Sequence, residues 1–321
     1  MALMATLALS AGALSCSTPE QATTCNWGVN MLMILPGGAT EQRYSPLANE
    51  LAFLDNSGAG IIDMTTGTIT EIGPNLKADL GDSLVPWFIQ AVDWSPYDNR
   101  LLVVMAANAW HDTLNNGRTV MLFLHNDGSL DTQFVGDWLG HSQYLLWLCD
   151  SHPSVDSLVF AYAPTDTQVS IYCPESHSFT LQKDAGIMRE SPSGKHTFGT
   201  WSGSYFLDGN VINWGNQNPI YVRSVSFSPD EKHIAFAVGQ LGSVEWIYNV
   251  SDLLSGKPVA PIAQLNFMPR YCLGSVLGAW GEFVSDTSLV VSLHADPTTG
   301  AQCNLYEVNF NGDIIRQLTH Y

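Results

Sequence analysis

The sequence predicts an all-β fold built from repeated four-stranded sheets. The first observation is the stretch from Ser226 to Phe236, SFSPDEKHIAF, which reads as two short strands joined by a tight turn. Proline presets φ for such a turn, and the aspartate after it can bond to the turn backbone. The second observation is that this turn recurs along the chain, and the third is that helical periodicity is nearly absent.

The turn occurs in six copies. The clear copies are Ser45-Pro46, Ser95-Pro96, Ser191-Pro192 and Ser228-Pro229, and the degenerate copies lie at Pro153 and Val284. Neighbouring copies are 37 to 57 residues apart, which suits one four-stranded antiparallel sheet with its turns. In the fifth copy we expect the strands at 221–227, 233–238, 244–250 and 259–265.

A large aromatic ring precedes the turn in three copies, at Tyr44, Trp94 and Phe227, whereas the fourth copy has Glu190 there. Such a ring can fill the wedge between neighbouring sheets. Packing the sheets around an axis covers each face and leaves only short edges. We therefore expect a six-bladed β-propeller over residues 26–321, after a leader and short linker over residues 1–25. The segment 30–36 is a spare strand that could close the ring by joining the last blade.

The repeat resembles the W-S-P-D-G-K-x-I-A-F unit of TolB-like six-bladed propellers, which also builds the propeller of prolyl oligopeptidases. The resemblance covers residues 26–321, although the turn glycine survives only as Gly194 and two copies lack Ser-Pro. It implies a TolB-like propeller that binds a protein partner in the cell envelope. The α/β domain that precedes the propeller in TolB is not expected in this chain.

The first fifteen residues form an apolar stretch without charges, too short to span a bilayer as a helix, which is typical of a secretion signal. Cys16 follows, and Ala13-Leu14-Ser15-Cys16 resembles a bacterial lipobox, whose cysteine takes a lipid. The usual leucine and the usual basic region are missing. We expect an exported protein, either periplasmic or anchored to the membrane as a lipoprotein through Cys16.

The other cysteines fit an oxidising compartment. Cys149 and Cys173 flank the strands of the third predicted blade, and Cys272 and Cys303 flank those of the sixth. Each pair could form a disulfide within its blade. The alternative is that all these cysteines are reduced and buried. No spacing of cysteine and histidine indicates a zinc site.

The 321 residues are 45% hydrophobic, enough for one domain with a substantial core. Thirty acidic against 12 basic residues give a net charge of −18. Such a field repels phosphate backbones and anionic lipid headgroups, so nucleic acid is not an expected partner. Membrane contact is expected only through a lipid on Cys16.

No sequence motif indicates catalysis. The G-x-S-x-G elbow, the HExxH motif and a phosphate-binding glycine loop are all missing from the sequence. Carboxylates are plentiful, but a sequence does not say which two face one another. We predict no cofactor, and an axial ion such as calcium stays open.

Long loops are expected on the face opposite the Ser-Pro turns, and long loops tend to be functional. They contain aromatic and charged residues suited to a protein or a glycan: Asp79, Asp82, Trp87, Trp110, His111, Asp112, Trp138, His141, Arg223, Arg270 and Tyr271. The alternative is that the tryptophans pack their own loops and the polar residues are solvated. A role for His111 and His141 as metal ligands or bases is a further alternative. We expect the charges of the Ser-Pro turns to be solvated.

Two functions therefore remain open. The first is an exported, non-catalytic propeller that serves as a binding or scaffold module for a protein partner in the cell envelope. The second is a glycan-active hydrolase or lyase, or a glycan binder, that uses the funnel between the long loops. The fold alone does not separate these functions.

Overall fold

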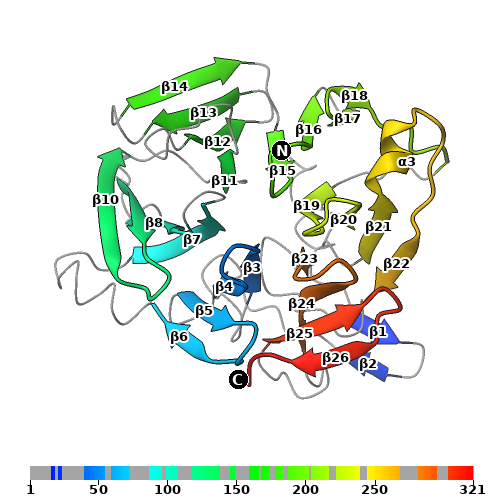
Figure 1. Ribbon diagram of the computed structural model, residues 1–321, viewed down its shortest axis with the longest axis horizontal. Helices are drawn as coiled ribbons and strands as arrows, with labels where there is room; N and C mark the ends of the chain where they lie inside the picture. Colours follow the sequence, from blue (N-terminus) through cyan, green and yellow to red (C-terminus); the bar gives the residue numbers. More distant parts are fainter. Residues whose placement is uncertain are drawn as a thin grey trace, which may run out of the picture.

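The computed structural model describes residues 16–18, 21–23, 40–54, 59–72, 87–95, 99–107, 118–137, 145–148, 159–165, 168–173, 178–183, 187–201, 204–216, 222–238, 244–267, 281–294 and 303–320. These residues are almost entirely strands and turns (Figure 1). A two-stranded hairpin, β1 (Cys16–Thr18) and β2 (Gln21–Thr23), precedes the repeated sheets.

The remaining strands form six four-stranded sheets, each in chain order, and every pairing is antiparallel. The first sheet is β3 (Thr40–Ser45), β4 (Glu50–Leu54), β5 (Ala59–Asp63) and β6 (Ile69–Glu71). The second is β7 (Trp87–Trp94), β8 (Leu101–Ala107), β9 (Arg118–Leu124) and β10 (Leu130–Asp137). The third is β11 (Leu145–Leu148), β12 (Val159–Thr165), β13 (Gln168–Cys173) and β14 (Ser178–Lys183).

The fourth sheet is β15 (Ile187–Glu190), β16 (Thr197–Trp201), β17 (Ser204–Leu207) and β18 (Asn210–Val211). The fifth is β19 (Val222–Phe227), β20 (His233–Val238), β21 (Val244–Asn249) and β22 (Ala263–Asn266), with the short helix α3 (Val250–Leu254) after β21. The sixth is β23 (Glu282–Phe283), β24 (Ser288–His294), β25 (Cys303–Asn309) and β26 (Ile314–Gln317).

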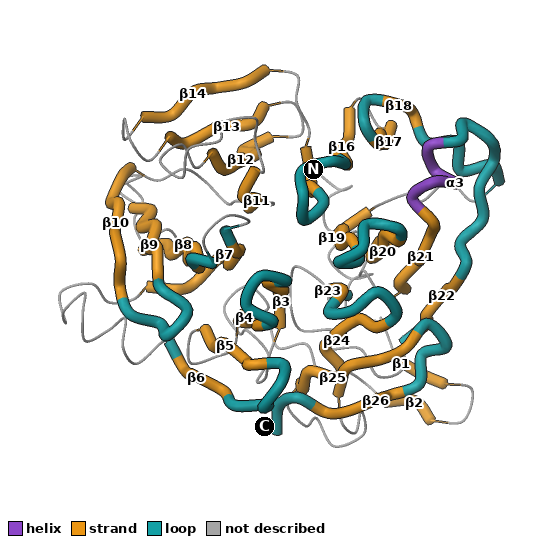
Figure 2. The backbone as a smooth tube through the Cα atoms, in the orientation of Figure 1, coloured by secondary structure: helices purple, strands orange, loops and turns teal. Residues whose placement is uncertain are grey.

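The sheets stand around a common centre like blades, and the first strand of each sheet is innermost (Figure 1). Each inner strand contacts the inner strand of the next blade, from β3 through β7, β11, β15 and β19 to β23, and β23 contacts β3 again. The prediction of an all-β propeller made of four-stranded antiparallel blades is confirmed. The Ser-Pro turns, drawn as teal loops close to the centre in Figure 2, lie at the ends of the inner strands.

The core lies between the blades, because each large buried cluster among the described residues joins two neighbours. One cluster packs Leu54 and Ile61 of the first blade against Leu101 of the second. Another joins the sixth blade to the first, where Val290 meets Phe53. Gln42 also donates its side-chain amide to the Val290 carbonyl at 2.9 Å. A flat sheet face is thus covered by the next sheet, as the repeat predicts.

The aromatic residues before the turns, Tyr44, Trp94 and Phe227, do fill the spaces between blades, and we refer to their position as the wedge position. Trp94 and Phe227 are buried, and Trp94 belongs to the cluster shared by the first and second blades. Phe227 packs with Phe198 and Leu207 of the preceding blade. Tyr44 is half-buried against the cluster that the sixth blade contributes. The aromatic rings before these three turns are therefore packing residues.

The fifth blade departs from the predicted strands at two places. The expected third strand ended at Val250, whereas Val250 begins the helix α3, and the fourth strand starts at Ala263 instead of Val259. Val250 and Leu253 are buried in the cluster between the fourth and fifth blades. The five-residue helix is too short to produce a periodic pattern in the sequence, which is why strand reasoning missed it.

The structure describes only two of the four cysteines in the predicted disulfides, Cys173 and Cys303. Cys303 is fully buried on β25 and is disulfide-bonded. Cys149 and Cys272 lie outside the described residues, so the predicted pairings with Cys173 and Cys303 remain predictions. Within the described ranges, no helix is long and apolar enough to cross a membrane.

Candidate binding site at the propeller axis

A pocket of about 410 Å³ opens at the centre of the face that carries the Ser-Pro turns. The inner strands of five blades end at this pocket, and four of their Ser-Pro turns or turn equivalents border it. We refer to it as the axial pocket, and its lining residues are Tyr44, Ser45, Pro46, Leu47, Asp93, Trp94, Ser95, Arg189, Glu190, Ser191, Pro192, Ser193, Phe227, Pro229, Asp230, Glu231, Glu282 and Phe283.

The repeat itself places polar side chains here. The residue before the wedge position occupies the same place in the five copies that the structure describes, and it is Arg43, Asp93, Arg189, Ser226 or Glu282. Successive strand residues point to opposite sides, so a wedge residue that faces the neighbouring blade leaves its predecessor facing the other way. These five positions therefore form a polar ring on the inner strands.

Arg189 connects two carboxylates across this ring. Its Nη2 donates to Glu282 Oε1 at 2.7 Å, and its Nη1 donates to Asp93 Oδ1 at 3.4 Å. All three side chains are largely buried. Because charge-assisted bonds are strong away from water, the fourth blade is tied here to the second and the sixth.

The first blade joins the same group of charges. Arg43 Nε lies 3.8 Å from Asp93 Oδ1, and Arg43 Nη1 donates to the Gln42 carbonyl at 3.0 Å. The indole Nε1 of Trp94 donates to the Arg43 carbonyl at 2.9 Å. The wedge residue of the second blade thus fixes the backbone that carries Arg43.

Glu282 is nearly fully buried, and only one of its two carboxylate oxygens has a hydrogen-bond partner among the described residues. Only 3% of the residue is exposed. Its Oε1 accepts two bonds, from Arg189 and from the Tyr44 backbone N–H at 3.2 Å, whereas its Oε2 is buried without a hydrogen-bond partner among the described residues. A buried carboxylate oxygen without a donor is costly, so this atom marks a position where a donor would be stabilised.

The edge of the axial pocket combines apolar and acidic groups. Leu47 is 58% exposed, and Pro46, Pro192 and Pro229 of three turns lie beside the opening. Glu190, Asp230 and Glu231 add three carboxylates to the lining. An apolar border around a charged centre is a composition that protein interfaces use.

Side-chain bonds join the turns of neighbouring blades, and we refer to these bonds as the turn latches. Ser45 Oγ donates to Asn99 Oδ1 at 2.6 Å, Ser193 N to Glu231 Oε1 at 2.7 Å, and Asp230 N to Asp286 Oδ1 at 2.9 Å. The expectation that the charges of the fifth turn are solvated holds only in part, because Asp230 and Glu231 are half-buried and the Glu231 carboxylate accepts from Ser193. Of that turn's charges, Lys232 is the most exposed.

The same bonds shift the pKa values of these carboxyl groups. Desolvation by burial raises the pKa of Asp230, but hydrogen bonds from Lys232 and Ser228 outweigh it and bring the pKa from its usual 3.8 to about 2. Burial likewise raises the pKa of Glu231, and bonds from Ser193 reverse the sign and lower it. Both carboxylates stay ionised at neutral pH, so the edge of the axial pocket keeps its negative charge.

The arrangement is suited to binding. The two buried carboxylates are both bonded to Arg189, and no group of three or more His, Cys, Asp or Glu side chains in the described part of the chain could hold a metal ion. The free Oε2 of Glu282 and the acidic edge favour a positively charged or hydrogen-bond-donating ligand.

The structure leaves most of the predicted site residues unplaced. Nine of them lie outside the described residues: Asp79, Asp82, Trp110, His111, Asp112, Trp138, His141, Arg270 and Tyr271. Trp87 begins β7 and Arg223 lies on β19, and only their backbone belongs to the described part. The axial pocket was missed because the sequence reasoning treated the Ser-Pro face as structural. The signal that could have found it is the charged residue before the wedge position in four of the copies, which is Arg43, Asp93, Arg189 or Glu282.

Comparisons with known proteins agree with the fold. No protein-family model and no curated protein matches the chain. The β-propeller domain of Cps50 (Swd1) from Myceliophteria thermophila is similar in structure, with a TM-score of 0.50 at 12% identity over 88% of this chain and 87% of that one.

Two proteins of Pyrococcus are less similar. The acylaminoacyl peptidase of Pyrococcus horikoshii gives a TM-score of 0.48 at 16% identity over 88% of this chain. The present chain spans only 45% of that peptidase. The propeller domain of the trilobed protease from Pyrococcus furiosus gives 0.43 at 15% identity, over 88% of this chain and 84% of that domain. The likeness to the Cps50 domain and the ring of four-stranded sheets together show that the chain has the β-propeller fold.

Proposed function

We propose that this chain is a non-catalytic propeller that binds a protein partner at the axial pocket. The observation that carries this proposal is the apolar border, with Leu47 and the turn prolines, around a buried charged centre. Interface hot spots have this build, because exposed apolar groups exclude water from a few strong polar contacts.

The chemistry of the axial pocket supports binding over catalysis. A general acid or base must reach its substrate with a proton or a lone pair. Asp93 is held by Arg189 and lies near Arg43, and one oxygen of Glu282 is held by Arg189. These bonds make the two carboxylates parts of a fixed network rather than free reagents. Glycan chemistry on the opposite face rests on loops outside the described residues, and no observation favours it.

Capture from an extract of the native source tests this proposal. Leu47→Asp places a charge on the apolar border, and we expect it to abolish capture of the partner, because an interface core excludes unpaired charges. Ile315→Asp is the matched control, since Ile315 is 54% exposed on the outer strand β26. Equal capture by both variants would mean that the partner binds elsewhere or that no partner exists.

We also propose that the ring is a TolB-like six-bladed propeller and that the chain is exported with Cys16 as a lipid acceptor. The Ser-Pro repeat supports the first statement, and the apolar leader followed by Cys16 supports the second. Labelling with a fatty acid, compared between the wild type and Cys16→Ser, tests the lipid. A label that persists in Cys16→Ser would end that part of the proposal.

A further inference from the structure

We propose that the axial pocket receives an arginine or lysine side chain from the partner, and that its cationic group bonds to Glu282 Oε2. This inference rests on the proposed function, since it names the chemistry of the partner at the same site. It depends on three features of the axial pocket: an unpaired buried oxygen, the sign of the surrounding charge and the form of the opening.

The unpaired oxygen defines the contact point. Glu282 lines the pocket, and its Oε1 is already used by Arg189 and Tyr44. A carboxylate accepts bonds on both oxygens, and its Oε2 lacks one here. A guanidinium or ammonium N–H would satisfy this oxygen with a charge-assisted bond, which is stronger than a bond from a neutral donor.

The surrounding charge favours a cation over a neutral donor or an anion. The lining contains five carboxylates, of Asp93, Glu190, Asp230, Glu231 and Glu282, against the single guanidinium of Arg189. Arg43 beside Asp93 and Lys232 beside Asp230 raise the basic count to three, which still leaves an excess of negative charge. The whole chain has the same sign, with a net charge of −18, and would draw a basic segment toward it.

The form of the opening favours a side chain on a polypeptide. The volume of about 410 Å³ lies at the lower end of the range for ligand pockets, about 300–1,000 Å³. Leu47 and three prolines border it, so apolar residues on either side of the basic residue would find contacts. A bare metal ion would use only the centre and leave this border uncovered.

Two peptides of the same shape, one cationic and one neutral, test the proposal. The probes are acetyl-Leu-Arg-Leu-amide and acetyl-Leu-citrulline-Leu-amide, where citrulline keeps the shape of arginine without its charge. Their affinities for the wild-type chain are measured by ligand-observed NMR at low salt. We expect the arginine probe to bind about 10-fold more tightly or better. We also expect added salt to reduce this preference.

Glu282→Gln locates the contact. Its amide oxygen can keep the bonds from Arg189 and Tyr44, and its NH₂ then faces the ligand where Oε2 stood. We expect the arginine probe to lose about 10-fold in affinity while the citrulline probe changes little. Glu307→Gln is the matched control, because Glu307 is a carboxylate of the same blade, bonded to Ser288 and Arg316 and outside the axial pocket.

Several results would overturn the inference. They are equal binding of the two probes, unchanged binding by Glu282→Gln, and displacement of the arginine probe by millimolar calcium. If Glu282→Gln does not fold, the preference of the wild type for the arginine probe over the citrulline probe still tests the inference. The proposed function fails separately, when Leu47→Asp captures the partner as well as the wild type does. Capture that depends on Leu47 without any preference for arginine would refute this inference alone.

Discussion

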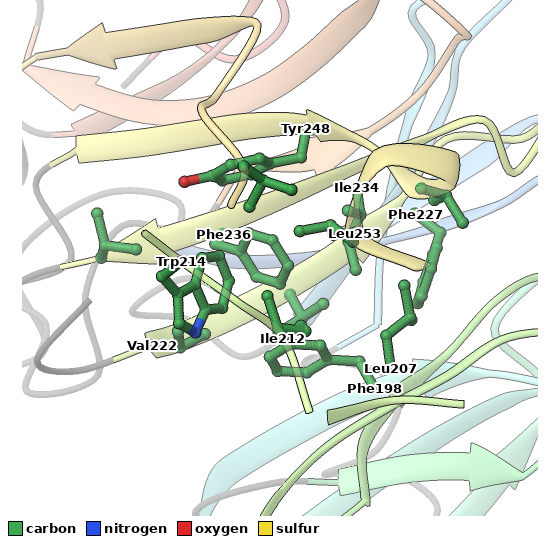
Figure 3. Close-up of a cluster of buried hydrophobic side chains, with 14 residues drawn as sticks. Phe198, Leu207, Ile212, Trp214, Val222, Phe227, Ile234, Phe236, Tyr248 and Leu253 are labelled. Atoms are coloured by element: carbon green, nitrogen blue, oxygen red, sulfur yellow. The ribbon is translucent and has the colours of Figure 1, made fainter. Parts of the chain in front are cut away.

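The interface between the fourth and fifth blades and the centre of the ring are both buried, but they use opposite chemistry. At the interface, Phe236 lies among Trp214, Phe198 and Tyr248, with ring centroids 4.9 to 5.8 Å apart (Figure 3). At the centre, Arg189 holds Asp93 and Glu282. The first region gains free energy from apolar area and close packing, whereas the second must offset the desolvation of its charges. Stability should therefore come mainly from between the blades, and binding specificity from the centre.

The largest effect should come from breaking the aromatic interface. Phe236 is fully buried, so Phe236→Ala removes its contacts and leaves a cavity. We expect a loss of about 3–5 kcal/mol in the free energy of unfolding, measured by urea denaturation. Val211→Ala serves as the control, because Val211 is 59% exposed on β18. A loss below about 1 kcal/mol for Phe236→Ala would show that the interface is loosely packed.

The next largest loss of stability should come from removing the ion pairs of Arg189 at the centre of the ring. Arg189→Met leaves the buried carboxylates of Asp93 and Glu282 without their shared cation, and we expect a loss on the order of 3 kcal/mol. Adding Glu282→Gln to this variant should recover part of the loss, because one buried charge is removed. Arg100→Met breaks the exposed pair with Asp131 and should cost at most about 1 kcal/mol. Similar losses for the two arginine variants would mean that the centre is well solvated.

A smaller effect is expected at Trp94, which contacts both the apolar core between blades and the polar centre of the ring. Trp94 packs between the first two blades and also donates to the Arg43 carbonyl. Trp94→Phe keeps a ring but leaves that carbonyl without its donor, and we expect a loss of about 1–2 kcal/mol. Tyr44→Phe removes a half-buried hydroxyl bond to Asn49, which water can replace, and should cost less. A larger loss for Tyr44→Phe than for Trp94→Phe would mean that the turn bond contributes more to stability than the indole bond does.

The smallest expected effect is on the stability of the fold at low pH. The pKa of Asp230 is about 2 in the fold against its usual 3.8. A carboxyl group with a lowered pKa stabilises the fold above its ordinary value, and this contribution disappears as the pH falls from about 4 to about 2. The difference in melting temperature between the wild type and Asp230→Asn should therefore shrink over this range. A constant difference would mean that the turn bonds do not depend on the charge.

The sequence predicts the parts of the fold that repeat. Pro46, Pro192 and Pro229 mark turns that recur, and the aromatic residues Tyr44, Trp94 and Phe227 were correctly assigned to the spaces between blades. The helix α3 occurs once, and each turn latch uses a different acceptor residue, so no repeat reveals them. The axial pocket could not be recognised in advance because Arg189 and Glu282 are about ninety positions apart, and only closure of the ring brings them within 2.7 Å. The residues expected on the opposite face remain predictions.

The turn latches also limit how this chain could change by gain or loss of repeats. Each latch uses a different residue of the following blade, Asn99 in one case, Glu231 or Asp286 in the others. A duplicated or transplanted blade would therefore present a different acceptor to its neighbour at these three junctions. The blades share an architecture, but the bonds that join their turns differ from one junction to the next.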